Sequence, residues 1–437
     1  MKTILLMIAL FSTSLAHAQG PGMICSGSTS STPTVRADGY AERVSDFIIT
    51  CTGGTPTING GMVPAVNLTV FVNTNITSQM LAAAGAPGDW SEALLLIGTD
   101  GAEPSGTATT AGNLRYCTST GCTMKGVGAP GGANYLATDS QNTNPANVFQ
   151  GRQSGANQII FMGVPVDPPG NGHTRTLRIT NIRANPNTLA YSLTIPTSIL
   201  MVVNSTGFAI GNNMQTIAMS LGGLVTGCEG SAKSSGVSFR ENFASSFKTG
   251  GTAASNIPGA NQTTENGFYN KTFAVSGANN FIAAVDQMTS NINNAGLAFA
   301  GTRLMVTFNE PSNQDIWLQS YIPLVDTATG NISGYAALVG GTLTAPNPLP
   351  TTASESTLTK VTVAAGVGSA VYEIMLTSLT KVEDLSIPFF DSTGKSLTFT
   401  GTADINLATS GGSGAASLTA PVPRFNATPT KTWTIGP

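Results

Sequence analysis

Short apolar runs separated by turn residues recur along the whole 437-residue chain. Residues 66–72 alternate partly between apolar and polar side chains, as a strand with one buried face does. Residues 92–98 (EALLLIG) contain a short apolar run closed by the turn residues 99–101, a pattern that suits a buried strand. Similar runs predict further strands at residues 46–51, 158–166, 174–182, 198–203, 215–219, 303–308, 316–322, 370–376, 385–390 and 397–401.

Residues 158–166 and 174–182 form the strongest hairpin pattern in the sequence. A turn sequence, Asp-Pro-Pro-Gly-Asn-Gly at 167–172, separates the two runs. In the second run Leu177 and Ile179 alternate with polar neighbours, so we expect these two side chains to point inward.

The order of these elements predicts the fold class. Many short strands separated by Gly, Pro and Asn turns, without alternating helices, favour β-sandwiches over a parallel α/β sheet. We predict an all-β protein of two consecutive Ig-like β-sandwich domains with long Gly/Thr/Asn-rich loops. The first domain is predicted at residues 36–227, with a cysteine-containing insertion near 101–147, and the second at residues 228–437. Small and polar residues at 19–35 predict a flexible N-terminal extension.

Two stretches leave the choice between strand and helix open. Phe239, Phe243 and Phe247 are spaced four residues apart, and residues 281–288 have a comparable apolar pattern. In either conformation we interpret both stretches as core-packing stripes and not as binding sites.

The N-terminus has the pattern of a secretory signal peptide at residues 1–18. A short positive region precedes an apolar stretch at 4–15, and Ala16-His17-Ala18 supplies the small-residue cleavage site. The stretch is shorter than the ~20 residues that span a bilayer. We predict a secreted protein, extracellular or at the cell surface, with the periplasm as the alternative location and no integral membrane segment.

Charged residues are unusually scarce. They make up 9% of the chain, whereas soluble domains carry about 25%. The net charge is −3, with 19 basic residues, and this excludes the basic face that nucleic-acid binding needs. With 41% hydrophobic residues the chain has enough apolar material for a core, so charge-rich disorder is excluded too.

Five cysteines remain after the predicted cleavage, and an oxidising compartment favours their pairing. Cys117 and Cys122 enclose a short turn-like loop that a disulfide would close. Cys25 would pair with Cys51, leaving Cys228 unpaired; alternatively, Cys51 would pair with Cys228 and leave Cys25 free.

Few residues in the sequence are candidates for catalysis. His173 is the single histidine of the predicted mature chain, and the hairpin pattern places it in an exposed turn, which suits neither a triad nor a metal site. Acids such as Glu92 and Glu383 are too scattered to define a glycosidase pair. We therefore predict no catalytic residues, no enzyme activity and no cofactor-binding residues.

The sequence offers two acidic turns as candidate metal sites. Asp326 and Asp391 begin turns that offer oxygen ligands for a structural calcium ion. Neither turn has the alternating acids of a calcium loop, and both fit ordinary Asx turns. No metal site is predicted.

Six segments resemble a family of uncharacterised secreted bacterial Ig-like β-rich proteins. The resemblance spans roughly residues 35–225 and more weakly the remainder. The segments are VRADG (35–39), ITCTGGTP (49–56), VFVNTNITS (70–78), SEALLL (91–96), NVFQGR (147–152) and TLRITNIR (176–183). The resemblance implies an exported Ig-like β protein and carries over no activity; relative to its pattern, the loop around Cys117 and Cys122 looks like an insertion.

These observations lead to three hypotheses of function. The first is a non-catalytic extracellular structural or surface-associated protein that self-assembles, helped by its low charge and by an extension at 19–35 that pairs with a neighbouring copy. The second is a glycan- or cell-surface-binding module of adhesin type. The third is a secreted hydrolase. The expected partners are the protein itself, neighbouring surface proteins or glycans.

Overall fold

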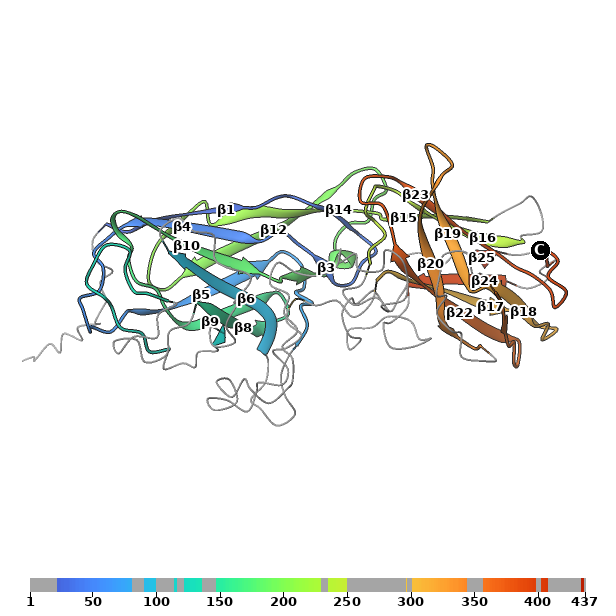
Figure 1. Ribbon diagram of the computed structural model, residues 1–437, viewed down its shortest axis with the longest axis horizontal. Helices are drawn as coiled ribbons and strands as arrows, with labels where there is room; N and C mark the ends of the chain where they lie inside the picture. Colours follow the sequence, from blue (N-terminus) through green and yellow to red (C-terminus); the bar gives the residue numbers. More distant parts are fainter. Residues whose placement is uncertain are drawn as a thin grey trace, which may run out of the picture.

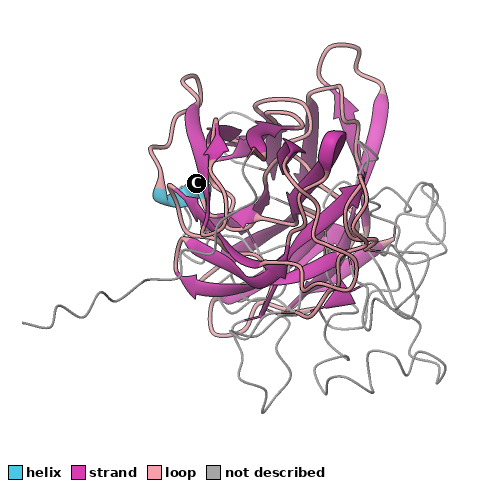
Figure 2. Ribbon diagram, turned by 90° about the vertical axis from the view of Figure 1, so that its left-hand side faces the viewer, coloured by secondary structure: helices cyan, strands magenta, loops and turns pink. Residues whose placement is uncertain are grey.

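The computed structural model describes residues 22–80, 90–99, 114–115, 122–135, 147–228, 235–249, 296, 301–343, 357–397, 402–407 and 434–435. Within these ranges the regular elements are β-strands, apart from a short 3-10 turn at Pro186–Thr188. The strands form two large curled sheets that lie end to end along the long axis (Figure 1). Seen along that axis, strands lie on opposite sides of the interior (Figure 2). The all-β prediction is confirmed.

The first β unit contains a 12-stranded sheet. Its order is β13-β1-β4-β10-β6-β8-β9-β5-β12-β14-β2, with β7 beside β8, and β3 and β11 pair separately. The strands are β1 (Ile24–Thr29), β2 (Thr34–Arg36), β3 (Glu42–Arg43), β4 (Phe47–Gly53), β5 (Ala65–Val72), β6 (Trp90–Thr99), β7 (Leu114–Arg115), β8 (Val148–Gly155), β9 (Gln158–Pro165), β10 (Gly170–Thr180), β11 (Arg183–Ala184), β12 (Thr197–Ser205), β13 (Ile210–Gly211) and β14 (Met214–Leu221).

The core of this unit follows the predicted patterns. In β5 the residues Val66, Leu68, Val70 and Val72 are buried and their neighbours are more exposed. β6 lies inside the sheet between β10 and β8, and its side chains from Trp90 to Ile97 are all buried. Each fully buried leucine of such a strand stabilises the fold by about 2 kcal/mol.

The N-terminal segment is part of the sheet, so the flexible extension predicted at 19–35 is wrong over its described part. β1 pairs with β4 along its whole length, and Cys25 lies directly opposite Cys51. Gly27 makes this close packing feasible, because a Cβ atom there would lie 2.6 Å from the Phe47 ring. The segment is therefore already paired within its own chain, although small polar residues gave it no strand pattern.

Strands β9 and β10 exist as predicted, but they do not form a hairpin. β10 pairs with β4 and β6, whereas β9 pairs with β5 and β8. The linker between them carries the chain from one part of the curled sheet to another. Leu177 and Ile179 are buried as expected, and β10 also buries Arg175.

The predicted insertion at 101–147 is partly built into the core. In its longest described part, 122–135, Tyr135 is fully buried, and its hydroxyl donates a 2.7 Å hydrogen bond to the Pro165 carbonyl. The Asp167 carboxylate accepts bonds from the amides of Thr57 and Ala133, at 2.8 and 2.6 Å. These bonds hold the segment against the sheet, so it is not an excursion from the fold.

The second β unit contains a nine-stranded sheet of order β15-β16-β23-β19-β20-β22-β17-β24-β25, and β18 pairs separately with β21. The strands are β15 (Leu224–Cys228), β16 (Gly236–Glu241), β17 (Arg303–Asn309), β18 (Ile316–Gln319), β19 (Tyr321–Asp326), β20 (Ile332–Gly341), β21 (Leu358–Val361), β22 (Val367–Leu376), β23 (Glu383–Pro388), β24 (Thr402–Leu407) and β25 (Thr434–Ile435).

This sheet corrects two sequence-based boundaries. β15 pairs with β16, so the second unit begins at Leu224 and not at residue 228. The strand predicted at 316–322 divides at Ser320 into β18 and β19, which belong to different sheets. The stretch containing Phe239, Phe243 and Phe247 is strand β16 followed by a turn and not a helix, and Phe239 and Phe247 are buried in the core.

Several predictions fall on residues outside the described ranges. They concern the signal peptide at 1–18, the apolar pattern at 281–288, Cys117 and most of the strand at 397–401. Within the ranges that are described, no helix is long and apolar enough to cross a bilayer.

Candidate functional site

A buried arginine of the first unit, which is part of an ion pair, also bonds the second unit. Arg36 in β2 is fully buried, and its guanidinium donates to Glu42 Oε1 from Nε at 3.1 Å and from Nη2 at 2.8 Å. Its third nitrogen, Nη1, donates a 2.8 Å bond to the hydroxyl of Thr302, immediately before β17 in the second unit. A single side chain of the first unit is thus bonded to both units.

Further polar contacts surround this pair. The Asn242 side-chain amide of the second unit donates to the carbonyls of Leu193 and Gly222, at 2.7 and 2.9 Å. Gly223 lies between the units, where a Cβ atom would be 2.2 Å from Arg36 Cγ, so a larger residue would displace the arginine. We call the contacts of Arg36, Asn242 and Gly223 the junction.

Two buried carboxyl groups lie close to the junction in the second unit. Glu241 accepts a 2.6 Å bond from the Phe247 amide and a 3.0 Å bond from the Glu383 amide. Glu383 accepts bonds from the Thr377 hydroxyl and the Ser378 amide. Burial, with a smaller contribution from the Glu383 charge, raises the pKa of Glu241 to about 8.

This raised pKa predicts a pH-dependent stability. The folded protein keeps the Glu241 proton between about pH 4.5 and pH 8, whereas the unfolded chain loses it. Stability should therefore fall as the pH rises through this window, by up to about 1.4 kcal/mol per pH unit, and then level off. Urea unfolding at pH 5.5 and 8 measures the slope, which Glu241→Gln should flatten. An equal slope in both proteins would contradict the assignment.

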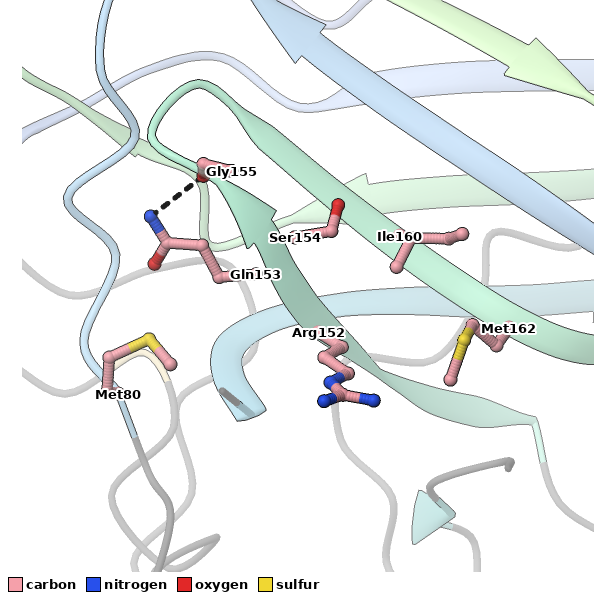
Figure 3. A pocket seen from close by; sticks show the side chains of 7 residues that line it. All are labelled: Met80, Arg152, Gln153, Ser154, Gly155, Ile160 and Met162. Carbon is pink, nitrogen blue, oxygen red and sulfur yellow. Dashed lines mark hydrogen bonds between the residues drawn. The ribbon is translucent and has the colours of Figure 1, made fainter. Parts of the chain in front are cut away.

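An open depression of about 750 Å³ lies on the first unit (Figure 3). Arg152 and Ser154 of β8 and Ile160 and Met162 of β9 contribute to its wall. Met80, Gln153 and Gly155 complete the described lining. These described residues include no acid, histidine or cysteine, and they supply hydrogen bonds, one guanidinium group, two thioethers and apolar surface.

Cys25 and Cys51 lie in the core of the first unit. A disulfide joins Cys25 to Cys51, the first of the two pairings that the sequence left open. Cys122 is disulfide-bonded as well, and Cys117 lies outside the described residues. Cys228 is the last residue of β15.

His173 and Asp326, which the sequence analysis considered as site residues, are held by contacts within the fold. His173 lies within β10 and is half-buried, so the predicted exposed turn is wrong. The Asp326 oxygens accept bonds from the Ala328 amide and the Thr329 hydroxyl, and one lies 3.1 Å from Lys381 Nζ. These bonds, led by that of Thr329, lower the pKa of Asp326 to about 2. This set of hydrogen bonds is that of an Asx turn.

Asp391 has the same kind of surroundings. One of its oxygens accepts bonds from the Thr393 amide and hydroxyl and from the Lys395 amide, at 2.8, 2.7 and 3.1 Å. Among the described residues, no group of three or more His, Cys, Asp or Glu side chains could hold a metal ion.

The acids considered for hydrolysis are packed inside the protein. Glu92 is fully buried 3.3 Å from the Arg183 guanidinium, and its other oxygen accepts a 3.2 Å bond from the Gly296 amide. Glu383 is fully buried in the other unit.

The sequence analysis did not identify the polar residues of the junction. The one signal available for them was that Arg36 stands between the apolar residues Val35 and Ala37.

Comparison with known proteins identifies no family. No family model matches the chain, and no curated protein matches it. Among solved structures, the wild-type C-terminal domain of the Streptococcus agalactiae AgI/II polypeptide BspA is similar at 8% identity and TM-score 0.25, over 88% of this chain and 96% of that one. The BSP domain of a biofilm-associated protein is similar at 7% identity and TM-score 0.18, over 97% of this chain and 53% of that one. TM-scores this low carry no argument, so the protein class is taken from its own fold.

Proposed function

We propose that the protein is a non-catalytic extracellular structural protein that acts as a stiff, surface-associated spacer. The observation that carries the proposal is the junction, where the fully buried Arg36 bonds Glu42 in its own unit and Thr302 in the other. Units joined only by a linker move freely relative to one another by default. A desolvated, hydrogen-bonded junction opposes that motion, because opening it would leave buried polar groups without partners.

Other features support the same proposal. The signal-peptide pattern at 1–18 suits export, and the Cys25–Cys51 disulfide suits an oxidising compartment. Several large apolar side chains are exposed and charge is scarce, which favours self-association. The most exposed are Ile24, Ile58, Met62, Ile195, Met214 and Ile332.

Small-angle X-ray scattering of the purified mature protein tests stiffness. A spacer should give the scattering of one elongated body, and the variant Asn242→Ala/Thr302→Ala should broaden its distance distribution by loosening the junction. The matched control is Asn213→Ala/Thr393→Ala. It removes one hydrogen bond inside the first unit, to Asn204, and one inside the second unit, to Asp391. A wild-type profile typical of two freely jointed units would contradict the proposal.

Self-association is tested separately. Sizing and electron microscopy over increasing protein concentration should show dimers or larger assemblies. A strictly monomeric protein at high concentration would remove self-assembly from the proposal and leave the spacer role in place.

A second candidate function is binding of a glycan or cell-surface ligand. The depression around Arg152 favours it, since it combines a few polar groups with apolar surface in a volume typical of ligand sites.

A further inference from the structure

Strand β1 closes a seam in the sheet of the first unit. It pairs antiparallel with β4 on one side and parallel with β13 on the other. The Gln215 side chain of β14 donates a 3.3 Å bond to the Gly27 carbonyl, so β14 reaches β1 as well. We call the space that β1 fills between β4 and β13 the slot. A slot without a strand would leave the backbone groups of β4 ready to pair with another chain.

The shape of the slot selects the sequence of β1. A Cβ atom on Gly27 would lie 2.6 Å from the Phe47 ring and 2.7 Å from the Asn212 carbonyl oxygen, so a larger residue does not fit at this position. Two residues earlier, Cys25 lies directly opposite Cys51. A strand that enters in this register thus needs a glycine two positions after a cysteine. The β1 strand of a second copy of the chain meets both requirements.

Strand β1 depends mainly on backbone pairing. Apart from glycine, Cys25 is its one buried residue, and Ile24, Ser26 and Ser28 are exposed. In the predicted mature chain only residues 19–23 precede this strand. It can therefore enter or leave the slot without threading a loop, and few side-chain contacts are broken when it does.

The segment at residues 30–33, which follows β1, has the features of a hinge. It reads Ser-Ser-Thr-Pro, and hydrogen bonds of 3.0 to 3.4 Å to Ser45 and Asp46 hold it in place. Ser31 is exposed, and Ser31 and Pro33 line a cavity of about 90 Å³, which removes packing contacts from one side of the segment. Proline fixes φ near about −65° and favours an extended residue before it, so the segment can also run straight on.

We propose that two copies of the protein exchange strand β1, so that β1 of each copy fills the slot of the other. The exchanged pair keeps the β1–β4 register and differs from two single copies mainly in the path of residues 30–33. High protein concentration favours the pair, because the same contacts form in both states and association costs entropy. The inference rests on the self-association in the proposed function and names the surface that produces it. The stiffness of the junction does not depend on it.

Disulfide trapping with two complementary variants of the full mature chain tests the exchange. Cys25→Ser keeps Cys51 and Cys51→Ser keeps Cys25, so a disulfide between these positions can only join two copies. The variants are refolded together from urea at high concentration in glutathione buffer. The two thiols lose two electrons and two protons to oxidised glutathione, which becomes two molecules of reduced glutathione. We expect a covalent heterodimer on a non-reducing gel, and peptide mapping should identify the Cys25–Cys51 link.

Two substitutions in the copy that donates Cys25 separate exchange from chance contact of thiols. Gly27→Val overfills the slot against Phe47 and should lower the yield of heterodimer about fivefold or more. Ser28→Val is the matched control, because Ser28 is exposed on the same strand, and its yield should equal that of the unmodified pair. Thermal unfolding shows that each variant is folded.

The inference is overturned if the folded variants give no Cys25–Cys51 heterodimer, or if Gly27→Val forms it as readily as Ser28→Val. Sizing of the wild type at the same concentration separates this failure from that of the proposed function. Assemblies of the wild type without the heterodimer would overturn the exchange and leave self-association through another surface. A monomeric wild type would overturn both. The scattering experiment on the junction is unaffected by these outcomes.

Discussion

Replacing Arg36 with alanine is expected to lower the free energy of unfolding of the first β unit by about 3–5 kcal/mol. The substitution leaves Glu42 as an uncompensated charge that is 2% exposed, and it removes one of the two donors to the Thr302 hydroxyl, the other being the Lys248 amide. Breaking one side of a buried ion pair is costly because the remaining charge has neither water nor a counter-ion. The variant should also loosen the junction.

Differential scanning calorimetry measures this effect, and the expected shift of the unfolding midpoint is on the order of 10 °C. Lys360→Ala is the control: it breaks the ion pair with Asp315, whose side chains are about one-third exposed, and should cost no more than about 1 kcal/mol. Arg36→Met/Glu42→Leu should recover much of the loss, because it removes both charges and keeps the volume. A midpoint for Arg36→Ala equal to that of Lys360→Ala would contradict the prediction.

The double substitution Cys25→Ala/Cys51→Ala is expected to destabilise the first unit by about 2–4 kcal/mol. The disulfide closes a loop with a sequence separation of 26 and ties β1 to β4. Without it the unfolded chain gains conformational freedom, and β1 depends on backbone pairing and packing alone. The second unit should be unaffected, since neither cysteine lies in it.

Calorimetry of the double variant and of Cys25→Ala alone separates the covalent bond from side-chain packing. Both proteins lack the disulfide, so their midpoints should lie close together and well below that of the wild type. Reducing agent is not a substitute for these variants, because Cys122 is also disulfide-bonded. A double variant within about 0.5 kcal/mol of the wild type would show that the disulfide contributes nothing to stability.

Strands with clear apolar patterns were predictable, and strands without them were not. β5 and β6 follow directly from residues 66–72 and 92–98, because their side chains are strong strand formers with a regular burial period. β1 reads Ile-Cys-Ser-Gly-Ser-Thr and has little apolar signal. It is a strand because β4 pairs with it and because glycine allows close contact with Phe47.

The candidate sites, too, were predictable only where a local sequence pattern marks them. The five cysteines were recognisable as disulfide candidates, whereas the choice of Cys51 as the partner of Cys25 depends on the register of β1 against β4. The depression brings Met80 next to Arg152 and Met162, and Met80 is far from both in the sequence. No local pattern marks such a group.

By itself the sequence determined the β class, the positions of most strands, the scarcity of charge and the export pattern, since all of these depend on local side-chain chemistry. Only the tertiary structure decided which strands pair, where the first unit ends and that Arg36 bonds both units. It also separated β9 from β10 despite their hairpin-like spacing. The physical reason is that pairing is decided by the burial of whole sheet faces, a non-local free energy that outweighs the preference of any single turn.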